Sequence, residues 1–388
     1  MGENAKEGGN FRVLFISSSS RFRLPERRSA YRKKFRGLSK IGDMNYIAVS
    51  DDGGRRHACV GAMELHLAPK TGFKPLDVML FLIFALLEGL KIIRKRRINI
   101  IYAQSPLLDG CIGCLLRTLT GCKLIVGIHG DWAGEIQYSK PGLARFLPLI
   151  NLIAKMVLRN ADVVRVISEA TKRRALEFIQ KDKIFPVMFP AFFDAEFFLE
   201  REIKHPKEDS VVFVGSLIGR KGVKYLLGGI RTVIAEYPKF RLYILGRGNK
   251  EGELKDLCRR LGIEDNVQFL GHQPAEVVME YIDRSLALVL PSLSEGLGRA
   301  ALEAMARGRP VIGSRVEGIL ETVNNDRGYL IPPKDSNAIS SAILSILRNK
   351  AEAMDKGMKG REYVAGEYSL EKYLNNYKEL FHFTLRDA

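Results

Sequence analysis

Cysteine is scarce in this sequence, and its pattern excludes a scaffold built on disulfides. The 388 residues contain five cysteines, an odd number spread over a long chain. Small secreted domains that depend on disulfides carry cysteine far more densely, so this set indicates a reducing compartment. Cys111 and Cys114 are separated by two residues in an apolar segment. Because no second such pair exists, a core position is favoured over a redox or zinc-binding role.

Long hydrophobic runs are also missing. The most hydrophobic stretch, Val78–Leu90, covers 13 residues, whereas a transmembrane helix needs about 20. The stretch is therefore predicted as a buried or interfacial helix. The first apolar run, Val13–Ile16, is too short for the core of a secretory signal, so a cytoplasmic protein is expected. Peripheral attachment to the inner face of the cell membrane stays open as an alternative.

Acidic residues are in short supply in the first half of the chain. Up to Pro190 there are 32 Lys and Arg against 16 Asp and Glu, and the whole chain has a formal charge of +17. A basic half indicates an anionic partner: nucleic acid, an anionic membrane surface or a phosphorylated substrate. Residues 78–97 join the apolar stretch to the sequence LKIIRKRR, which is typical of a membrane-surface element. A core helix whose basic end complements its dipole fits the same residues.

Two motifs that would define other functions are absent. A dinucleotide-dependent oxidoreductase carries Gly-x-Gly-x-x-Gly with an acidic residue about 20 positions later, and the sequence Gly246-Arg247-Gly248 is only a fragment of that pattern. Basic residues interleaved with aromatic ones, typical of RNA-binding modules, do not occur either. No nucleic-acid partner is therefore expected, although the charge keeps a nucleic-acid-binding protein as an alternative.

The chain does contain alternating apolar strands and helix-length segments. Strand signals at 11–16, 98–103 and 123–128 have the spacing of βαβ units in a parallel sheet. A loop is expected at Ser17–Ser20, after the first strand. Ligands of such sheets gather at the carboxyl ends of the strands. His129 directly follows one of these ends and is therefore a candidate for substrate contact.

The most informative stretch is LPSLSEGLGRAALEAMARGRP, residues 290–310. It is predicted as the end of a buried strand, a glycine-bearing loop and a helix that begins near Gly298. Amide groups at the start of that helix suit a diphosphate. Glu295 and Glu303 can accept hydrogen bonds from vicinal hydroxyls. Eight residues make about 2.2 helical turns, so one carboxylate can hold a sugar while the other holds a ribose.

The block SLSEGLGRAALEAMARGRPVIGS, with the later EGILETV and GYLIPPKD, resembles the donor site of the retaining glycosyltransferases of family four, or group 1, which have the GT-B fold. The resemblance is close in the C-terminal half and looser in the N-terminal half. It implies an α/β architecture of two Rossmann-like domains facing a cleft. Residues 1–192 would bind the acceptor and residues 193–367 the nucleotide sugar. The tail, residues 368–388, would pack back on the N-terminal domain.

The resemblance also implies an activity. A hexose would pass from a UDP- or GDP-linked donor to a hydroxyl acceptor with retention of configuration. No cofactor or dedicated metal would be needed, and the sequence contains no Asp-x-Asp pair to hold one. The basic, hydrophobic N-terminal half favours a lipid-linked or polysaccharide acceptor. A sugar-nucleotide epimerase of the same fold is the nearest alternative.

Particular residues acquire roles from the same resemblance. His129, Lys221 and Glu295 are expected at the reaction centre, and Lys221 with Arg299 would stabilise the diphosphate. The residues expected to line the donor site are Gly215, Ser216, Arg220, Lys221, Gly246, Gly296, Leu297, Gly298, Arg299 and Glu303.

Two departures from the family pattern stand out. Ser216 occupies a position where the family commonly has an arginine, so one expected cation is missing. The serines of Ser17–Ser20 stand where a glycine pair often touches the donor phosphate. That phosphate contact is therefore not carried over.

Overall fold

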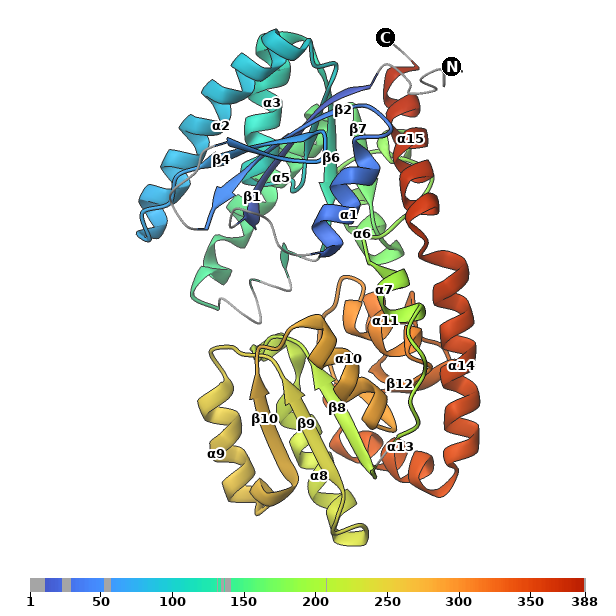
Figure 1. Ribbon diagram of the computed structural model, residues 1–388. Helices are drawn as coiled ribbons and strands as arrows, with labels where there is room; N and C mark the ends of the chain where they lie inside the picture. Colours follow the sequence, from blue (N-terminus) through green and yellow to red (C-terminus); the bar gives the residue numbers. More distant parts are fainter. Residues whose placement is uncertain are drawn as a thin grey trace, which may run out of the picture. The chain divides into compact units, whose positions relative to one another are not determined.

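The structure is a computed structural model, which describes residues 11–22, 29–51, 57–130, 132–133, 136, 141–206 and 208–386. The chain divides into two compact units (Figure 1). The N-terminal unit comprises residues 1–129, 146–192 and 370–388, and the C-terminal unit comprises residues 130–145 and 193–369.

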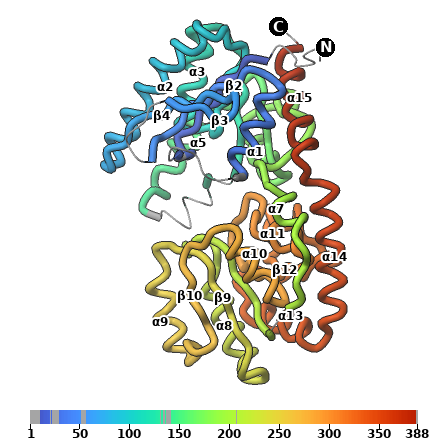
Figure 2. The backbone as a smooth tube through the Cα atoms, viewed as in Figure 1, coloured from blue at the N-terminus to red at the C-terminus, as the bar shows by residue number. Residues whose placement is uncertain are grey.

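The N-terminal unit is built on a seven-stranded sheet with the order β3-β4-β2-β1-β5-β6-β7. Neighbouring strands are parallel except for β3 and β4, which form an antiparallel pair at one edge. Figure 2 traces the backbone and labels β3. The strands are β1 Arg12–Phe22, β2 Asp43–Ser50, β3 His57–Val60, β4 Met63–Ala68, β5 Ile100–Ala103, β6 Lys123–Ile128 and β7 Val163–Val166.

Helices cover both faces of this sheet. The helices are α1 Ser29–Leu38, α2 Lys74–Arg96, α3 Leu108–Thr120, α5 Leu147–Asn160, α6 Glu169–Leu176 and α15 Leu370–Leu385, with a 3-10 turn at Lys181–Lys183. A further 3-10 turn, Pro141–Phe146, leads from residues of the C-terminal unit back into this one. Side chains of a strand alternate between faces, and β1 shows which helix lies on which side. Leu14 lies against Gly89 of α2, whereas the ring of Phe15 is 6.2 Å from that of Tyr377 in α15. The helix α3 packs against both α2 and α5.

The C-terminal helix α15 returns to the N-terminal unit. Its Phe381 ring lies 5.4 Å from Phe11 at the start of β1, and its Tyr377 ring lies 6.0 Å from Tyr102 in β5. These contacts bury Tyr377 and Phe381 almost completely. Aromatic pairs at such separations stabilise packing beyond the area that they bury, so the last helix forms part of this unit's core.

The prediction of a loop at Ser17–Ser20 is wrong, because β1 continues through these residues and forms a bulge there. Ile16 pairs with Ile47 and the next pair joins Arg21 to Val49, so the register shifts in between. The serine hydroxyls bond among themselves, with Ser17 Oγ donating to Ser20 Oγ at 2.8 Å. Local bonds of this kind satisfy polar groups within an irregular strand, which the serine composition alone did not distinguish from a loop.

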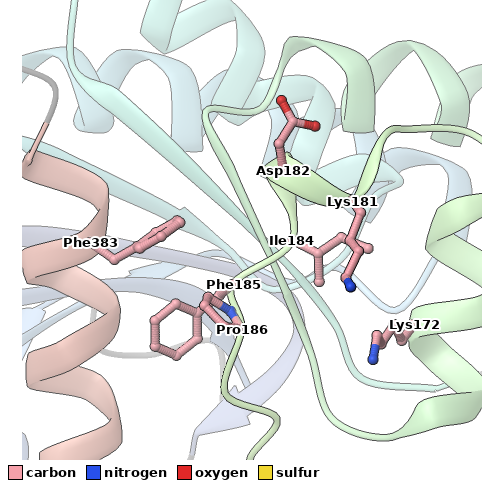
Figure 3. A pocket seen from close by; sticks show the side chains of 7 residues that line it. All are labelled: Lys172, Lys181, Asp182, Ile184, Phe185, Pro186 and Phe383. Carbon is pink, nitrogen blue, oxygen red and sulfur yellow. The ribbon is translucent and has the colours of Figure 1, made fainter.

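A pocket of about 540 Å³ opens beside α15 in the N-terminal unit (Figure 3). It is lined by Lys172, Lys181, Asp182, Ile184, Phe185, Pro186 and Phe383. Phe185 and Phe383 lie close to each other, with ring centroids 5.5 Å apart. None of the residues predicted for the donor site lines this pocket.

The C-terminal unit contains a six-stranded parallel sheet with the order β10-β9-β8-β11-β12-β13. Its strands are β8 Ser210–Val214, β9 Arg241–Leu245, β10 Val267–Gly271, β11 Ala287–Leu290, β12 Val311–Ser314 and β13 Gly328–Ile331. Its helices are α7 Ala195–Leu199, α8 Val223–Glu236, α9 Glu251–Leu261, α10 Ala275–Arg284, α11 Arg299–Ala306, α12 Glu317–Leu320, α13 Ser336–Arg348 and α14 Lys350–Glu367, with 3-10 turns at Gly219–Lys221 and Glu264–Asn266. The strands β11 and β12 are buried along their whole length, as expected of a parallel sheet covered on both faces.

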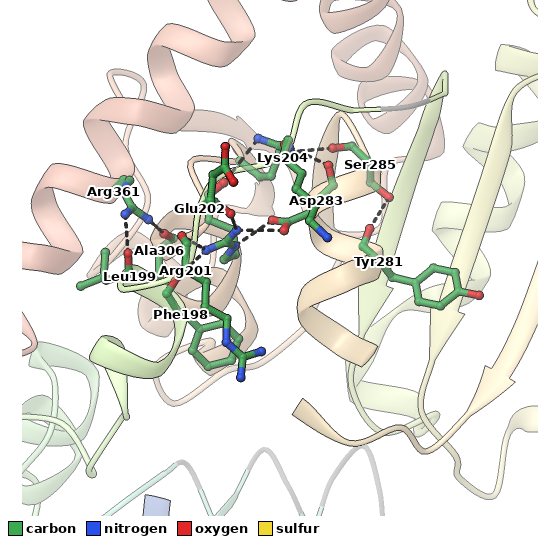
Figure 4. A network of polar contacts seen from close by, with 12 residues as sticks. Phe198, Leu199, Arg201, Glu202, Lys204, Tyr281, Asp283, Ser285, Ala306 and Arg361 are labelled. Carbon is green, nitrogen blue, oxygen red and sulfur yellow. Dashed lines mark hydrogen bonds and ion pairs between the residues drawn. The ribbon is translucent and has the colours of Figure 1, made fainter. Parts of the chain in front are cut away.

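A network of polar contacts around Asp283 and the residues after α7 holds the segment that leads into this unit (Figure 4), and the buried arginines Arg307 and Arg309 are its centre. The guanidinium of Arg307 pairs with Asp283 at 2.7 Å and also donates to the carbonyl oxygens of Phe198 and Arg201. Arg309 donates to the carbonyl oxygens of Lys204 and Asp283. Because one guanidinium offers five N–H donors, two side chains are enough to fix the path of the segment that follows α7.

The crossover from the N-terminal to the C-terminal unit contains two adjacent phenylalanines with different surroundings. Phe192 belongs to the N-terminal unit, where its ring is 5.2 Å from Tyr373. Phe193 belongs to the C-terminal unit, where its ring stacks 5.5 Å from Phe198. The chain therefore passes from one core to the other between two consecutive residues.

Candidate functional site

Two strand-to-helix loops of the C-terminal unit come together around Gly222. One loop follows β8 and ends in the 3-10 turn Gly219–Lys221, and the other follows β11. Gly222 has φ +65, and a Cβ atom at this position would lie 2.0 Å from the carbonyl oxygen of Pro291. Only glycine allows both the left-handed backbone and the close approach. The loops are also joined by a hydrogen bond of 2.7 Å from the Leu293 amide to the Arg220 carbonyl.

This approach places Glu295 against two cations. Lys221 Nζ donates directly to Glu295 Oε2, and Arg220 Nη1 lies 3.7 Å from Oε1. Ser292 Oγ donates to Oε2 at 3.2 Å. The second loop is held further by Arg220, whose Nη1 donates to the carbonyl oxygen of Ser294 at 3.2 Å. The residues predicted from the two separate sequence blocks thus meet at one point.

The surroundings of Glu295 decide its charge. Burial by itself raises the pKa of the carboxyl group. Lys221, Arg220 and the Ser292 hydroxyl together lower the pKa by more than burial raises it, so the net pKa lies below the ordinary value. Stabilisation of the charged form by nearby cations is the usual cause of such a shift. Glu295 is therefore ionised at neutral pH and can accept hydrogen bonds from hydroxyl groups.

Glu303 lies in different surroundings, as the eight-residue spacing allowed. Burial raises the pKa of its carboxyl group, and Arg299 offsets that rise only in part. Arg299 Nε donates to Glu303 Oε1 at 3.2 Å, an i,i+4 contact on α11. The Arg299 side chain is 59% exposed, so it can leave this contact at little cost.

The remaining predicted residues follow strands β8, β9 and β11 of the same sheet. Gly215 and Ser216 follow β8, and the Gly215 amide donates to Leu245 at 2.9 Å. Gly246 follows β9, and a Cβ atom there would lie 1.8 Å from the Gly215 carbonyl oxygen. Gly296, Leu297 and Gly298 lead into α11, with Gly298 as its N-cap at φ +72. Gly298 makes no side-chain cap bond at that helix start.

His129 follows β6 in the N-terminal unit, at the carboxyl edge of that sheet. Its Nε2 atom lies 3.5 Å from Nη1 of Arg165. Burial, and then the charges of Arg165 and Lys34, hold the pKa of His129 well below its usual range. The imidazole is therefore neutral at physiological pH. Asp131, two residues later, lies outside the described residues.

Arg165 and Lys34 were missed by sequence reasoning. Arg165 sits inside β7 with no exposed surface and donates to Tyr102 Oη at 3.2 Å and to the Pro190 carbonyl at 2.8 Å. Burial, with Arg165 nearby, lowers the pKa of Lys34 to about 8. The sequence signal for Arg165 was its position as a single arginine within the apolar strand DVVRVIS. Charged residues are rarely buried without partners, so an arginine at such a position indicates a polar network.

The serine-rich part of β1 does not offer the amide contact that the family often provides. The Ser18 amide donates to Asp109 Oδ1 at 2.7 Å, and Asp109 is fully buried. Burial raises the pKa of Asp109, although the Ser18 contacts oppose that rise. The Ser18 amide is therefore bonded to Asp109 and is not available to a phosphate. This agrees with the replacement of the family's glycine pair by serines in the sequence.

Cys111 and Cys114 are free thiols on α3. Burial raises the pKa of both, that of Cys114 to about 11. A thiol with a raised pKa is a poor nucleophile and a poor metal ligand at neutral pH. Both side chains are half-buried and lie outside the buried core, so the core position favoured from the sequence is wrong.

Comparison with known proteins gives a consistent result for both units. Residues 194–363 match the family model described as "Glycosyl transferases group 1", and residues 36–187 match "Glycosyltransferase Family 4". The chain belongs to the group 1 glycosyltransferases, of family four. It is 26% identical over 308 residues to N-acetyl-alpha-D-glucosaminyl L-malate synthase of Bacillus anthracis, covering 76% of this chain and 78% of that protein.

Solved structures confirm the GT-B fold. Sucrose-phosphate synthase from Thermosynechococcus elongatus has a TM-score of 0.80 and 21% identity, with coverage of 98% of this chain and all of that chain. Anabaena HepE in complex with UDP-glucose has a TM-score of 0.73 and 16% identity, again covering 98% and 100%. At these identities the likeness establishes the fold, while the substrates have to be argued from the residues. No helix in the described part of the chain is long and apolar enough to span a bilayer.

Proposed function

We propose that this glycosyltransferase moves a hexose from a UDP- or GDP-linked donor to a hydroxyl acceptor with retention of configuration. The observation that carries the proposal is the meeting of Lys221, Arg220 and Glu295 at the carboxyl ends of β8 and β11. Ligands of open parallel sheets bind at such ends. The complex of HepE with UDP-glucose favours UDP as the nucleotide.

The cations of this cluster suit a diphosphate leaving group. Lys221 uses one donor on Glu295, and an ammonium group has three, so two remain for phosphate oxygens. Arg220 adds a second charge, and the start of α11 adds amide groups. Charge that develops on the leaving diphosphate would be offset by these fixed groups, which is how the chain could work without a metal ion.

The two carboxylates suit hydroxyl groups. Glu295 is ionised and would accept a hydrogen bond from a hydroxyl of the transferred sugar. Glu303 would hold the ribose, with Arg299 released toward the diphosphate. His129, held neutral beside Arg165, would contact the sugar from the N-terminal unit. No residue is assigned as a covalent nucleophile, and retention is proposed through departure and attack on the same face of the sugar.

The acceptor is proposed to be membrane-bound, because the helices α2, α3 and α5 expose large apolar side chains. The exposed positions are Val78, Met79, Ile83, Leu87, Leu115, Leu119, Leu149, Leu152 and Met156. The end of α2 adds Arg94, Lys95 and Arg96. An apolar face bordered by basic residues binds the surface of an anionic bilayer. A lipid-linked acceptor would be reached there.

The donor proposal is tested with a panel of nucleotide sugars, read by thermal shift and by release of nucleoside diphosphate. One UDP- or GDP-sugar should stabilise the wild-type protein, and Lys221→Met should remove both signals. Lys224→Met, at an exposed position on α8, is the matched control and should behave as wild type. Wild-type turnover in Lys221→Met would overturn the assignment. Conversion of the donor to an epimer without acceptor would establish the epimerase alternative instead.

The membrane proposal is tested by flotation with anionic liposomes at low and high salt. The wild-type protein should float at low salt, and Ile83→Asp with Leu87→Asp should prevent it. Both positions are at least half exposed, so the fold should tolerate the changes. Absence of flotation at low salt would refute the membrane proposal and leave the donor site untouched.

A further inference from the structure

The antiparallel hairpin at the edge of the N-terminal sheet brings together two histidines and a glutamate. His57 of β3 is the cross-strand partner of His66 in β4, and Glu64 lies two residues before His66. The nearest ligand atoms of the three side chains all lie within 4.8 Å of one another. Glu64 Oε2 is 3.7 Å from Nε2 of each histidine.

The buried member of this group has an unsatisfied nitrogen. The side chain of His66 is only 9% exposed, and its Nε2 atom has no hydrogen-bond partner. Its other ring nitrogen, Nδ1, lies 3.2 Å from Glu88 Oε1 on α2. Leaving a buried polar atom unpaired costs about 1–3 kcal/mol. The unpaired Nε2 atom of His66 lies beside the imidazole of His57 and the carboxylate of Glu64, and a bound ligand would remove this cost.

We propose that His57, Glu64 and His66 bind one zinc ion. Zinc takes imidazole nitrogen and carboxylate oxygen at about 2.0–2.2 Å in tetrahedral geometry. Those bond lengths place neighbouring ligand atoms roughly 3.4 Å apart, close to the 3.7 Å between Glu64 and each histidine. A distance of 3.7 Å is too long for a hydrogen bond, so these atoms converge without bonding one another. A water molecule takes the fourth position.

The surrounding residues orient the ligands as metal sites require. Glu88 accepts the Nδ1–H of His66, which leaves Nε2 as the free ligand atom, and carboxylates in this position are typical of zinc-binding histidines. Arg96 Nη2 donates to Oε1 of Glu64, so that Oε2 of the same carboxylate faces the histidines. The ion would join β3 to β4 at the edge of the sheet formed by the described strands. This site is separate from donor chemistry and does not depend on the proposed function.

The test uses tag-free full-length protein, stripped with a chelator and titrated with zinc chloride by calorimetry. One equivalent should bind. His57→Gln should weaken binding at least tenfold, and because the His57 side chain is 55% exposed the variant should fold. Glu88→Gln should weaken it 10–100-fold. His272→Gln, at another exposed histidine, is the matched control.

Cobalt spectroscopy separates this site from the cysteines. Cobalt bound at the hairpin should give tetrahedral ligand-field bands and no thiolate-to-metal charge-transfer band. A thiolate band, absence of a stoichiometric ion, or wild-type affinity in His57→Gln with an unchanged circular dichroism spectrum would each overturn the proposal. None of these readouts depends on glycosyl transfer.

Discussion

The ion pair between Lys221 and Glu295 predicts unequal costs for removing its two partners. Lys221→Met leaves Glu295 with Arg220 at 3.7 Å and the Ser292 hydroxyl at 3.2 Å. Glu295→Gln leaves two neighbouring cations without the carboxylate that neutralises them. The second substitution should therefore destabilise the fold more than the first.

The magnitude follows from the burial of the pair. Breaking a fully buried ion pair by removing one partner costs about 3–5 kcal/mol. Here the side chains of Lys221 and Glu295 are 12% and 10% exposed, so water relieves part of that penalty. We expect losses of about 1–2 kcal/mol for Lys221→Met and about 2–3 kcal/mol for Glu295→Gln, with a coupling of about 1–2 kcal/mol in the double variant.

Urea unfolding of the four proteins at pH 7 measures this double-mutant cycle. Because the pKa of Glu295 is lowered in the folded state, its contribution is present above the unfolded pKa, near 4.3. It is lost as the pH falls through the still lower folded value. The difference between wild type and Glu295→Gln should therefore be constant from pH 6 to 8 and should shrink in acid.

Two results would refute the reasoning. A coupling energy below about 0.5 kcal/mol would mean that the pair does not act as a unit. A larger loss for Lys221→Met than for Glu295→Gln would mean that Arg220 and Ser292 do not support the carboxylate. Donor-dependent thermal shift in the same four proteins then separates stability from binding.

Three further predictions concern single positions. Gly222→Ala should reduce turnover at least tenfold and cost more than about 2 kcal/mol in urea unfolding, since it combines a left-handed backbone with a clash against Pro291; unchanged kinetics would show that the loops need not touch. Arg307→Met should cost about 3–5 kcal/mol by leaving Asp283 charged and buried, and adding Asp283→Leu should recover part of the loss in the same assay. Glu303→Gln should stabilise the protein at pH 8 and change its stability little at pH 4. The pKa of Glu303 is raised in the folded state, so the stability of the wild-type protein is full below the unfolded pKa and falls as the pH rises and the buried carboxyl group ionises. Equal effects of the substitution on the free energy of unfolding at both pH values would contradict this prediction.

The parts that could be predicted from sequence are those with local signals. The strand, glycine loop and helix around Glu295 follow from an apolar run, a proline and the glycines Gly296 and Gly298. The parallel sheets follow from the alternation of strand and helix lengths. Lys221 and Glu295 are 74 residues apart, and Lys221 was placed beside Glu295 only by the resemblance to the family motif.

The features that escaped depend on pairing across distance. His57 faces His66 only because β3 runs antiparallel to β4, and no local pattern encodes that register. Glu88 joins them from a helix that appeared in the sequence as an apolar segment with a basic end. Arg165 likewise shows its role only when the carbonyl oxygens that it binds are brought beside β7.

Arg307 and Arg309 bind the entry segment of the C-terminal unit through its carbonyl oxygens. The carboxylate that pairs with Arg307, that of Asp283, belongs to α10 and lies outside this segment. Recognition of the main chain is indifferent to side-chain identity. Residues such as Arg201 and Lys204, both exposed, are thus free to diverge among relatives or to carry labels and tags, provided that the number of residues in the segment stays the same. A one-residue insertion there would shift the spacing of the carbonyl groups and leave buried guanidinium protons without acceptors.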